Sequence, residues 1–151
     1  MKKNISIFFL ALFIISCNEN INSDSVIAKK IEKECNNNLS CRINMATLVN
    51  KDWDKMFVFK EGVSLEQINQ VLGFKYDYFE DIAKRIVFVK GNQVVFHEDE
   101  FQGVENAKNG ELVFNIGDSL MFKSYLPNEA IFNVQRIEFS KGIYYELTSV
   151  K

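Results

Sequence analysis

The chain begins with an apolar run that is too short to cross a membrane. Lys2 and Lys3 give a basic start, and the run over residues 5–15 is interrupted only by Ser6. A helix of that length reaches roughly 16 Å, whereas the hydrocarbon core of a bilayer is about 30 Å thick. A basic start, a short apolar run and a small residue are typical of a secretory signal peptide. We therefore expect residues 1–16 to be removed, so that the rest of the 151-residue chain builds the fold.

A cysteine follows directly on this signal. The sequence Ile14-Ile15-Ser16-Cys17 places two aliphatic residues and a small one before the thiol. It matches a lipobox, and residues 1–17 resemble a bacterial lipoprotein precursor. The resemblance implies that the Cys17 thiol receives a diacylglycerol, that cleavage falls before Cys17, and that the new amine can be acylated. The alternative is an ordinary secretory peptide followed by a coincidental cysteine.

The polar residues 17–24 indicate a lipidated tether, and residues 25–151 are long enough for one domain. Two or three acyl chains anchor a protein stably. The net charge of −2 does not favour anionic headgroups or nucleic acid, so the lipid is the expected anchor. Asn18 stands where Asp often retains lipoproteins at the inner membrane. We expect a bacterial membrane protein that faces the periplasm or the cell exterior, with the outer membrane favoured where there is one.

The other two cysteines, Cys35 and Cys41, form an even pair in an exported chain. Oxidising compartments convert such pairs to disulfides, and the turn-forming residues 36–40 are short enough to bring the sulfurs together. A redox-active pair usually has two intervening residues, which does not fit this spacing. A metal site would need further ligands, and the single histidine, His97, is far away in sequence. We expect a disulfide and neither a metal nor a cofactor.

Two segments have helical periodicity. The first follows the cap candidates at positions 23–25 and has an apolar residue every four positions. The second begins at a capping box formed by Ser64 and Gln67, and it ends before Gly73. The apolar positions are Ile27, Ile31 and Cys35 in the first segment and Leu65, Ile68, Val71 and Leu72 in the second.

Most of the remaining chain has the pattern of strands. Residues 41–49 could continue the helix, but the alternation of apolar and polar side chains favours a strand there. Residues 53–60 are expected to form another strand, and residues 74–81 a loop or a short helical turn. Two-residue turns predict three hairpins, which pair 85–90 with 93–98, 111–115 with 119–125, and 130–140 with 143–150. Residues 86–89 are apolar on both faces, which favours a central strand. The expected class is α+β, with two short helices on one face of a mostly antiparallel sheet, packed over Phe132, Val134 and Tyr145.

The segment Trp53-Asp54-Lys55, with its following aromatic and aliphatic residues, carries a second resemblance. Together with the helix at 64–73 and the strand at 87–89, it is similar to a group of small bacterial envelope lipoproteins that share this strand motif. The likeness spans roughly residues 41–100. The function of that group is largely unknown, so the resemblance implies no catalytic residue. Trp53 itself is expected in the core, and Asp54 is expected to cap a turn or to pair with Lys55.

The sequence contains no G-x-S-x-G, H-E-x-x-H, P-loop or G-x-G-x-x-G motif. A histidine-dependent enzyme would have to use His97, which precedes Glu98, Asp99 and Glu100. These acids could make His97 a general base or hold a cation. We favour a solvated acidic loop after a strand. Even within a strand, the three consecutive acids would point alternately to opposite faces and could not converge on one proton or one ion. His97 is therefore expected to carry no essential chemistry.

The aromatic and acidic stretch from Tyr76 to Asp81 is a further candidate. Such a stretch can line a carbohydrate or peptide site. More often its rings complete a core, which is the interpretation we favour.

The lipobox and the absence of these catalytic motifs together predict a non-enzymatic function: a lipid-anchored envelope protein that binds another protein or a wall component in envelope assembly or maintenance. The alternatives are a toxin-immunity lipoprotein and an enzyme that uses paired carboxylates on an envelope polymer.

Overall fold

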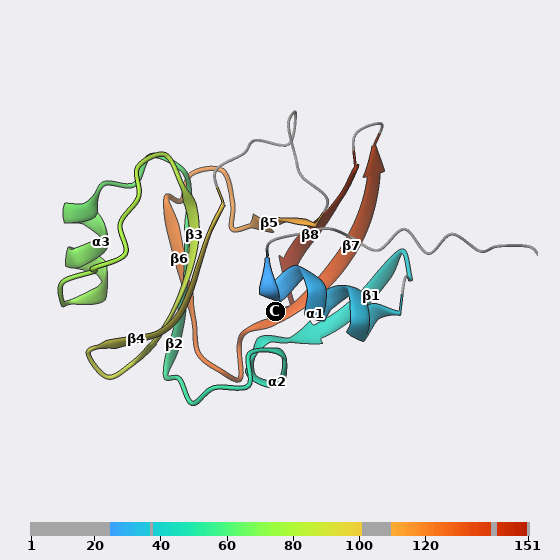
Figure 1. Cartoon of the computed structure of the whole chain (residues 1–151), viewed down its shortest axis with the longest axis horizontal. Helices are drawn as coiled ribbons and strands as arrows, with labels where there is room; N and C mark the ends of the chain where they lie inside the picture. The colour runs from blue at the N-terminus through green and yellow to red at the C-terminus, as the bar shows by residue number, and fades with distance from the viewer. Residues whose placement is uncertain (1–24, 37, 101–109, 140–141, 151) are drawn as a thin grey trace, which may run out of the picture.

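A computed structural model describes residues 25–36, 38–100, 110–139 and 142–150. Within these residues the chain forms three helices and eight strands, which confirms the α+β class (Figure 1). The helices are α1 (Val26–Cys35), α2 (Met45–Leu48) and α3 (Leu65–Leu72). The strands are β1 (Ser40–Asn44), β2 (Lys55–Phe59), β3 (Lys84–Lys90), β4 (Gln93–Glu100), β5 (Glu111–Asn115), β6 (Phe122–Tyr125), β7 (Ile131–Phe139) and β8 (Gly142–Ser149).

The strands form two sheets and not the single sheet that the sequence predicted. The first sheet has the order β1-β7-β8-β5, and the second has the order β4-β3-β2-β6. Neighbouring strands are antiparallel except for β5 and β8, which are parallel. Along the chain, the strands change sheet after β1, after β4, after β5 and after β6, so both sheets combine early and late parts of the sequence (Figure 1).

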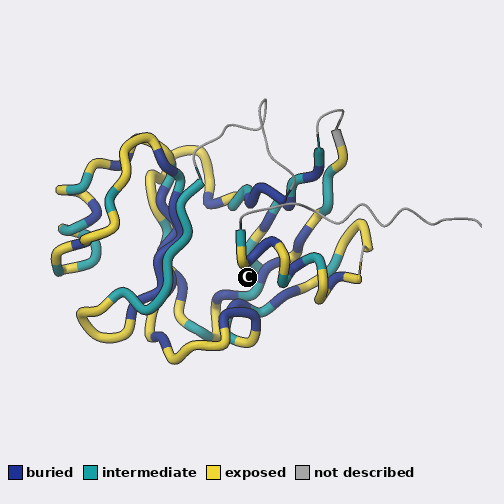
Figure 2. The backbone as a smooth tube through the Cα atoms, viewed as in Figure 1, coloured by how far each residue is buried: buried dark blue, intermediate teal, exposed yellow. Residues whose placement is uncertain are grey.

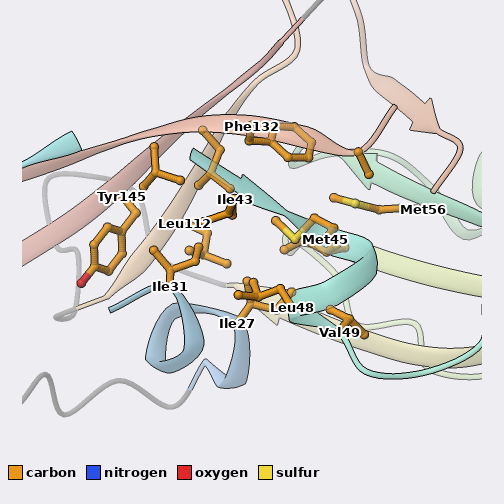
Figure 3. Packing of buried hydrophobic residues seen from close by; sticks show 14 of the residues in the cluster. Ile27, Ile31, Ile43, Met45, Leu48, Val49, Met56, Leu112, Phe132 and Tyr145 are labelled. Carbon is orange, nitrogen blue, oxygen red and sulfur yellow. The ribbon is translucent and has the colours of Figure 1, made fainter. Parts of the chain in front are cut away.

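A large hydrophobic core joins α1, α2 and both sheets. Ile27 and Ile31 of α1 contribute to this first core together with Tyr145 of the first sheet and Met56 of the second (Figure 3). The residues Phe132, Val134 and Tyr145, which were expected beneath the helices, are all buried here. Burial of these apolar side chains supplies the main driving force for packing the two sheets together.

A second, smaller core lies between the second sheet and α3. Residues of β2 alternate between the two cores, because Met56 and Val58 belong to the first and Phe57 and Phe59 belong to the second. The same alternation holds in β3, so β2 and β3 are buried on both faces (Figure 2). This confirms the prediction that residues 86–89 occupy a central strand.

The helices do not share one face, because α1 and α3 pack on opposite faces of β2 and β3. Helix α3 forms where its capping box predicted: Ser64 accepts a hydrogen bond from the Gln67 amide, Gln67 returns one to the Ser64 amide, and Gly73 ends the helix with φ 80°. Ile68 is its fully buried residue, and the apolar neighbours of Ile68 on that helix are only partly covered. The fully buried part of α3 is therefore limited to Ile68, and the helix packs only against the second core.

Two further predictions about pairing and local structure were wrong. The strand predicted over residues 41–49 stops at Asn44, where the Asn44 side chain accepts a hydrogen bond from the Ala46 amide and starts α2. The predicted hairpin around Gly117 and Asp118 is absent, because β5 pairs with β8 and β6 pairs with β2. The glycine turn instead carries the chain from one sheet to the other.

Candidate functional site

The predicted anchor lies outside the described residues. Cys17, the lipobox, the tether and the cap candidates at positions 23 and 24 all precede Ser25, where the description begins. Ser25 caps α1 by accepting a hydrogen bond from the Ala28 amide. Among the helices that the structure describes, none is long and apolar enough to span a bilayer.

Cys35 and Cys41 are joined in a disulfide, with their Cα atoms 5.5 Å apart. Cys35 is the last residue of α1 and Cys41 lies in the edge strand β1. The turn between them is reinforced by a hydrogen bond from the Asn38 amide to the Cys35 carbonyl at 2.9 Å. The pair therefore fixes the end of the first helix to the first sheet.

The acidic run after His97 is a continuation of β4 and not a solvated loop, since the strand extends to Glu100. Its residues point alternately to the two faces of the second sheet. His97 pairs with Val87, which belongs to the second core, and Glu98 pairs with Ile86, which belongs to the first. The structure thus separates Glu98 and Glu100 from His97 and Asp99, and the four side chains do not converge on one point.

Glu98 caps the start of α1. Its carboxylate accepts hydrogen bonds from the Ser25 hydroxyl at 2.7 Å and from the backbone amides of Val26 and Ile27 at 2.7 and 3.1 Å. A carboxylate at a helix N-terminus satisfies unpaired amides and interacts favourably with the helix dipole. Burial raises the pKa of Glu98, and these hydrogen bonds oppose that rise. Glu98 therefore links the second sheet to the first residues of the helix.

Glu100 makes the corresponding link at the other end of the same face. Both of its carboxylate oxygens lie near the Leu112 amide of β5, at 3.0 and 3.2 Å. Burial raises the pKa of Glu100 to about 8; the Leu112 hydrogen bond opposes the rise and the Glu111 charge adds to it. Lys84 forms an ion pair with Glu111 at 3.1 Å next to this contact.

The raised pKa of Glu100 makes the stability of the fold dependent on pH. The folded state holds the Glu100 proton more strongly than the unfolded state does, so stability should decrease as the pH rises from about 4.5 to about 8. Urea unfolding of the full-length protein across this range should show a smaller decrease for Glu100→Gln, whose neutral amide can still accept from Leu112. The exposed Glu61→Gln serves as the control. An unchanged pH profile for Glu100→Gln would contradict this assignment.

A buried arginine organises the opposite face of β4. The Arg85 side chain is 2% exposed and lies 3.3 Å from the Asp99 carboxylate. It donates to the Glu80 carbonyl, and its guanidinium lies over the Phe79 ring at 4.8 Å and the Tyr76 ring at 5.6 Å. Burial raises the pKa of Asp99, while the charges of Arg85 and His97 oppose the rise. The role of Arg85 was not predicted from the sequence, although an arginine directly before the run Ile-Val-Phe-Val was the available signal.

His97 belongs to the same group of side chains. Its imidazole stacks on the Tyr78 ring with centroids 4.3 Å apart, and the Tyr76 ring meets it edge-on at 6.2 Å. The aromatic stretch at 76–81 therefore covers β3 and β4, as the core interpretation predicted for Tyr76, which is fully buried. The arrangement holds a loop against the sheet through ring stacking and a buried ion pair.

The Trp53-Asp54-Lys55 motif also has a structural place. Trp53 is buried and meets Phe88 edge-on at 5.1 Å, which confirms its core position. Asp54 accepts from the Gly91 amide at 2.8 Å and pairs with Lys90 at 2.9 Å, and not with Lys55 as one expectation had it. The Gly91 hydrogen bond, together with Lys90, lowers the pKa of Asp54. The motif fastens the turn between β3 and β4.

The surface around β6 is apolar, which the sequence analysis did not predict. Four large hydrophobic residues within seven positions, here called the β6 strip, are each 40–47% exposed: Leu120, Met121, Phe122 and Leu126. Strand β6 is an edge of the second sheet, so the strip flanks an open strand. The run Leu-Met-Phe was the available signal, but residues 119–125 were assigned to one strand of the predicted hairpin around Gly117 and Asp118.

The described residues contain no group of three or more histidine, cysteine or acidic side chains arranged to hold a metal ion. A small cavity of about 140 Å³ lies beside the start of α1, but the two lysines on its wall are used by the fold. Lys30 donates to the Leu48 carbonyl at 2.7 Å, and Lys51 donates to the Val95 carbonyl at 2.9 Å.

Comparisons with protein families, with curated proteins and with solved structures returned no match.

Proposed function

We propose that this chain is a lipid-anchored protein of the bacterial envelope that binds another protein through the β6 strip. The observation that carries the proposal is the exposure of the four strip residues at one edge of a sheet whose central strands, β2 and β3, are buried. Apolar side chains that gather on one surface mark interaction sites more often than scattered ones do. The lipobox at Ile14-Ile15-Ser16-Cys17 supplies the expected anchor.

The positions of the acidic residues favour binding over carboxylate-dependent catalysis. Glu98 is engaged by three donors at the start of α1, Glu100 by the Leu112 amide, and Asp99 by the Arg85 guanidinium. A pair of carboxylates that acts on a polymer must converge on one bond in a cleft. The three acids of β4 instead point to different faces and contact parts of their own fold.

The strip can be tested in the native membrane. Crosslinked full-length protein, purified from its own envelope, should lose at least about tenfold of a captured partner when Leu120 and Met121 are both replaced by serine, because removal of apolar contact area weakens binding. Leu39→Ser is the matched control, since Leu39 is 70% exposed but lies outside the strip. Equal capture by the double variant and by Leu39→Ser would contradict the proposal.

A further inference from the structure

Strand β6 has an unpaired edge whose backbone groups point away from the sheet. The Lys60 amide donates to the Met121 carbonyl at 2.9 Å, which places Phe59 and Phe122 in a non-hydrogen-bonded pair. Backbone groups alternate in direction along a strand, so those of Met121, Lys123 and Tyr125 face β2. The amides and carbonyls of Phe122 and Ser124 therefore face outward, and no hydrogen bond joins any of them to another described residue.

The open stretch is short and has defined ends. At one end, the Leu120 amide is directed to the Gly117 carbonyl. At the other end, the Leu126 amide donates to the Glu129 carboxylate at 3.1 Å, and the Leu126 carbonyl accepts from the Ala130 amide at 2.9 Å. Between these ends lie two outward donors and two outward acceptors, the amides and carbonyls of Phe122 and Ser124. They suffice to pair with the backbone of about three extended residues.

The side chains around this edge define the chemistry of the residues that would fit. Phe122 lies on the face of the second core, where its ring centroid is 5.9 Å from that of Phe59. Lys123 lies on the other face, with its ammonium 5.2 Å from the Tyr125 ring centroid and 3.4 Å from the Ser149 hydroxyl. A strand laid against β6 would place an apolar side chain beside Phe122 and a charged one opposite Lys123.

We propose that β6 binds an extended segment of another protein as an additional strand, with an acidic side chain opposite Lys123 and apolar side chains on either side of it. Main-chain hydrogen bonds provide affinity in this mode of recognition, and the alternate side chains provide specificity. The inference rests on the proposed function and specifies the kind of partner that the β6 strip accepts.

A second copy of this chain is a poorer occupant of the same edge. A symmetric antiparallel pair that uses all four outward groups must place Phe122 of one copy opposite Ser124 of the other. That register sets the two Lys123 side chains directly across from each other. Like charges in directly opposed positions destabilise a strand pair. An acidic residue of a different protein removes this repulsion and replaces it with attraction.

A proline substitution tests the backbone contact without disturbing the sheet. Ser124→Pro removes an outward amide that β2 does not use, and proline is tolerated at such edge positions. The probe is a fluorescent eight-residue peptide that alternates valine and threonine, with one central glutamate. Its affinity for the full-length protein in detergent should fall at least about tenfold in Ser124→Pro and stay within about twofold in Ser124→Ala, since each 1.4 kcal/mol corresponds to a factor of ten. The urea midpoint of Ser124→Pro reports that the fold is intact.

Charge reversal tests the specificity. A matched peptide with central lysine should bind more weakly than the glutamate peptide, and Lys123→Glu should reverse that order. Equal affinity in a folded Ser124→Pro variant, or no binding of either peptide to the wild type, would overturn the inference. A wild-type dimer that Ser124→Pro abolishes would assign the edge to a second copy instead. If the membrane partner is lost in the Leu120 and Met121 variant but retained in Ser124→Pro, strand addition fails while the proposed function stands.

Discussion

Replacement of Asp99 by alanine is expected to lower the free energy of unfolding by about 3–5 kcal/mol, because it leaves the buried Arg85 guanidinium without its counter-charge. The raised pKa of Asp99 indicates that burial costs this carboxylate more than Arg85 and His97 return. The predicted loss of unfolding free energy therefore comes from leaving the buried Arg85 charge without a partner. It does not require the ion pair itself to be strongly stabilising. Urea unfolding of the full-length protein measures the difference.

Two controls separate this cause from a general effect of losing an acid. Asp77→Ala breaks the ion pair with Lys75, in which both side chains are largely exposed, and should cost no more than about 1 kcal/mol. Combining Arg85→Met with Asp99→Leu removes both charges and should recover most of the lost stability. An Asp99→Ala protein as stable as Asp77→Ala would show that Arg85 does not depend on this carboxylate.

Replacement of Cys17 by serine is expected to abolish lipid attachment completely. The thiol is the proposed acceptor of the diacylglycerol, and a hydroxyl is a far weaker nucleophile at neutral pH. Metabolic labelling with a radioactive fatty acid should mark the wild-type protein and leave Cys17→Ser unlabelled, with its signal peptide retained. Mass spectrometry of the N-terminal fragment shows whether the lipid is attached and whether the signal peptide has been removed.

The remaining cysteines provide the matched control for this experiment. The double variant Cys35→Ser and Cys41→Ser loses the disulfide but keeps the lipobox, so it should be labelled as the wild type is. Labelling of Cys17→Ser at the wild-type level would refute the lipoprotein proposal. Labelling lost in both variants would point to a defect in export.

Features that depend on nearby residues were the ones that the sequence predicted well. The helix α3 follows from Ser64, Gln67 and Gly73, which all lie within one short segment. The turn at Gly91 between β3 and β4 has the same local origin. Helix α2 was missed because Ile43, Met45 and Thr47 alternate as a strand would, although Asn44 is an effective helix cap.

Contacts between distant parts of the chain could not be predicted in the same way. The parallel pairing of β5 with β8 joins residues that are more than thirty positions apart, and a Gly-Asp turn is compatible with either a hairpin or a crossover. The role of Glu98 depends on amides at positions 26 and 27, about seventy residues earlier. A run of three acids shows a charge pattern, but which face each acid occupies follows only from the register of β4.

The cap formed by Glu98 has a mechanical consequence for a protein held by its N-terminus. In the lipid-anchored form that we propose, a pull between the membrane and a bound partner enters the domain at Ser25. There the load divides, because Glu98 ties the first turn of α1 to the second sheet while Cys35 and Cys41 tie its last turn to the first sheet. Helix α1 is thus loaded against both sheets at once, and the carboxylate contacts, which are not covalent, should yield before the disulfide does. Tension would therefore first free the start of the helix from β4 and leave its far end attached to β1.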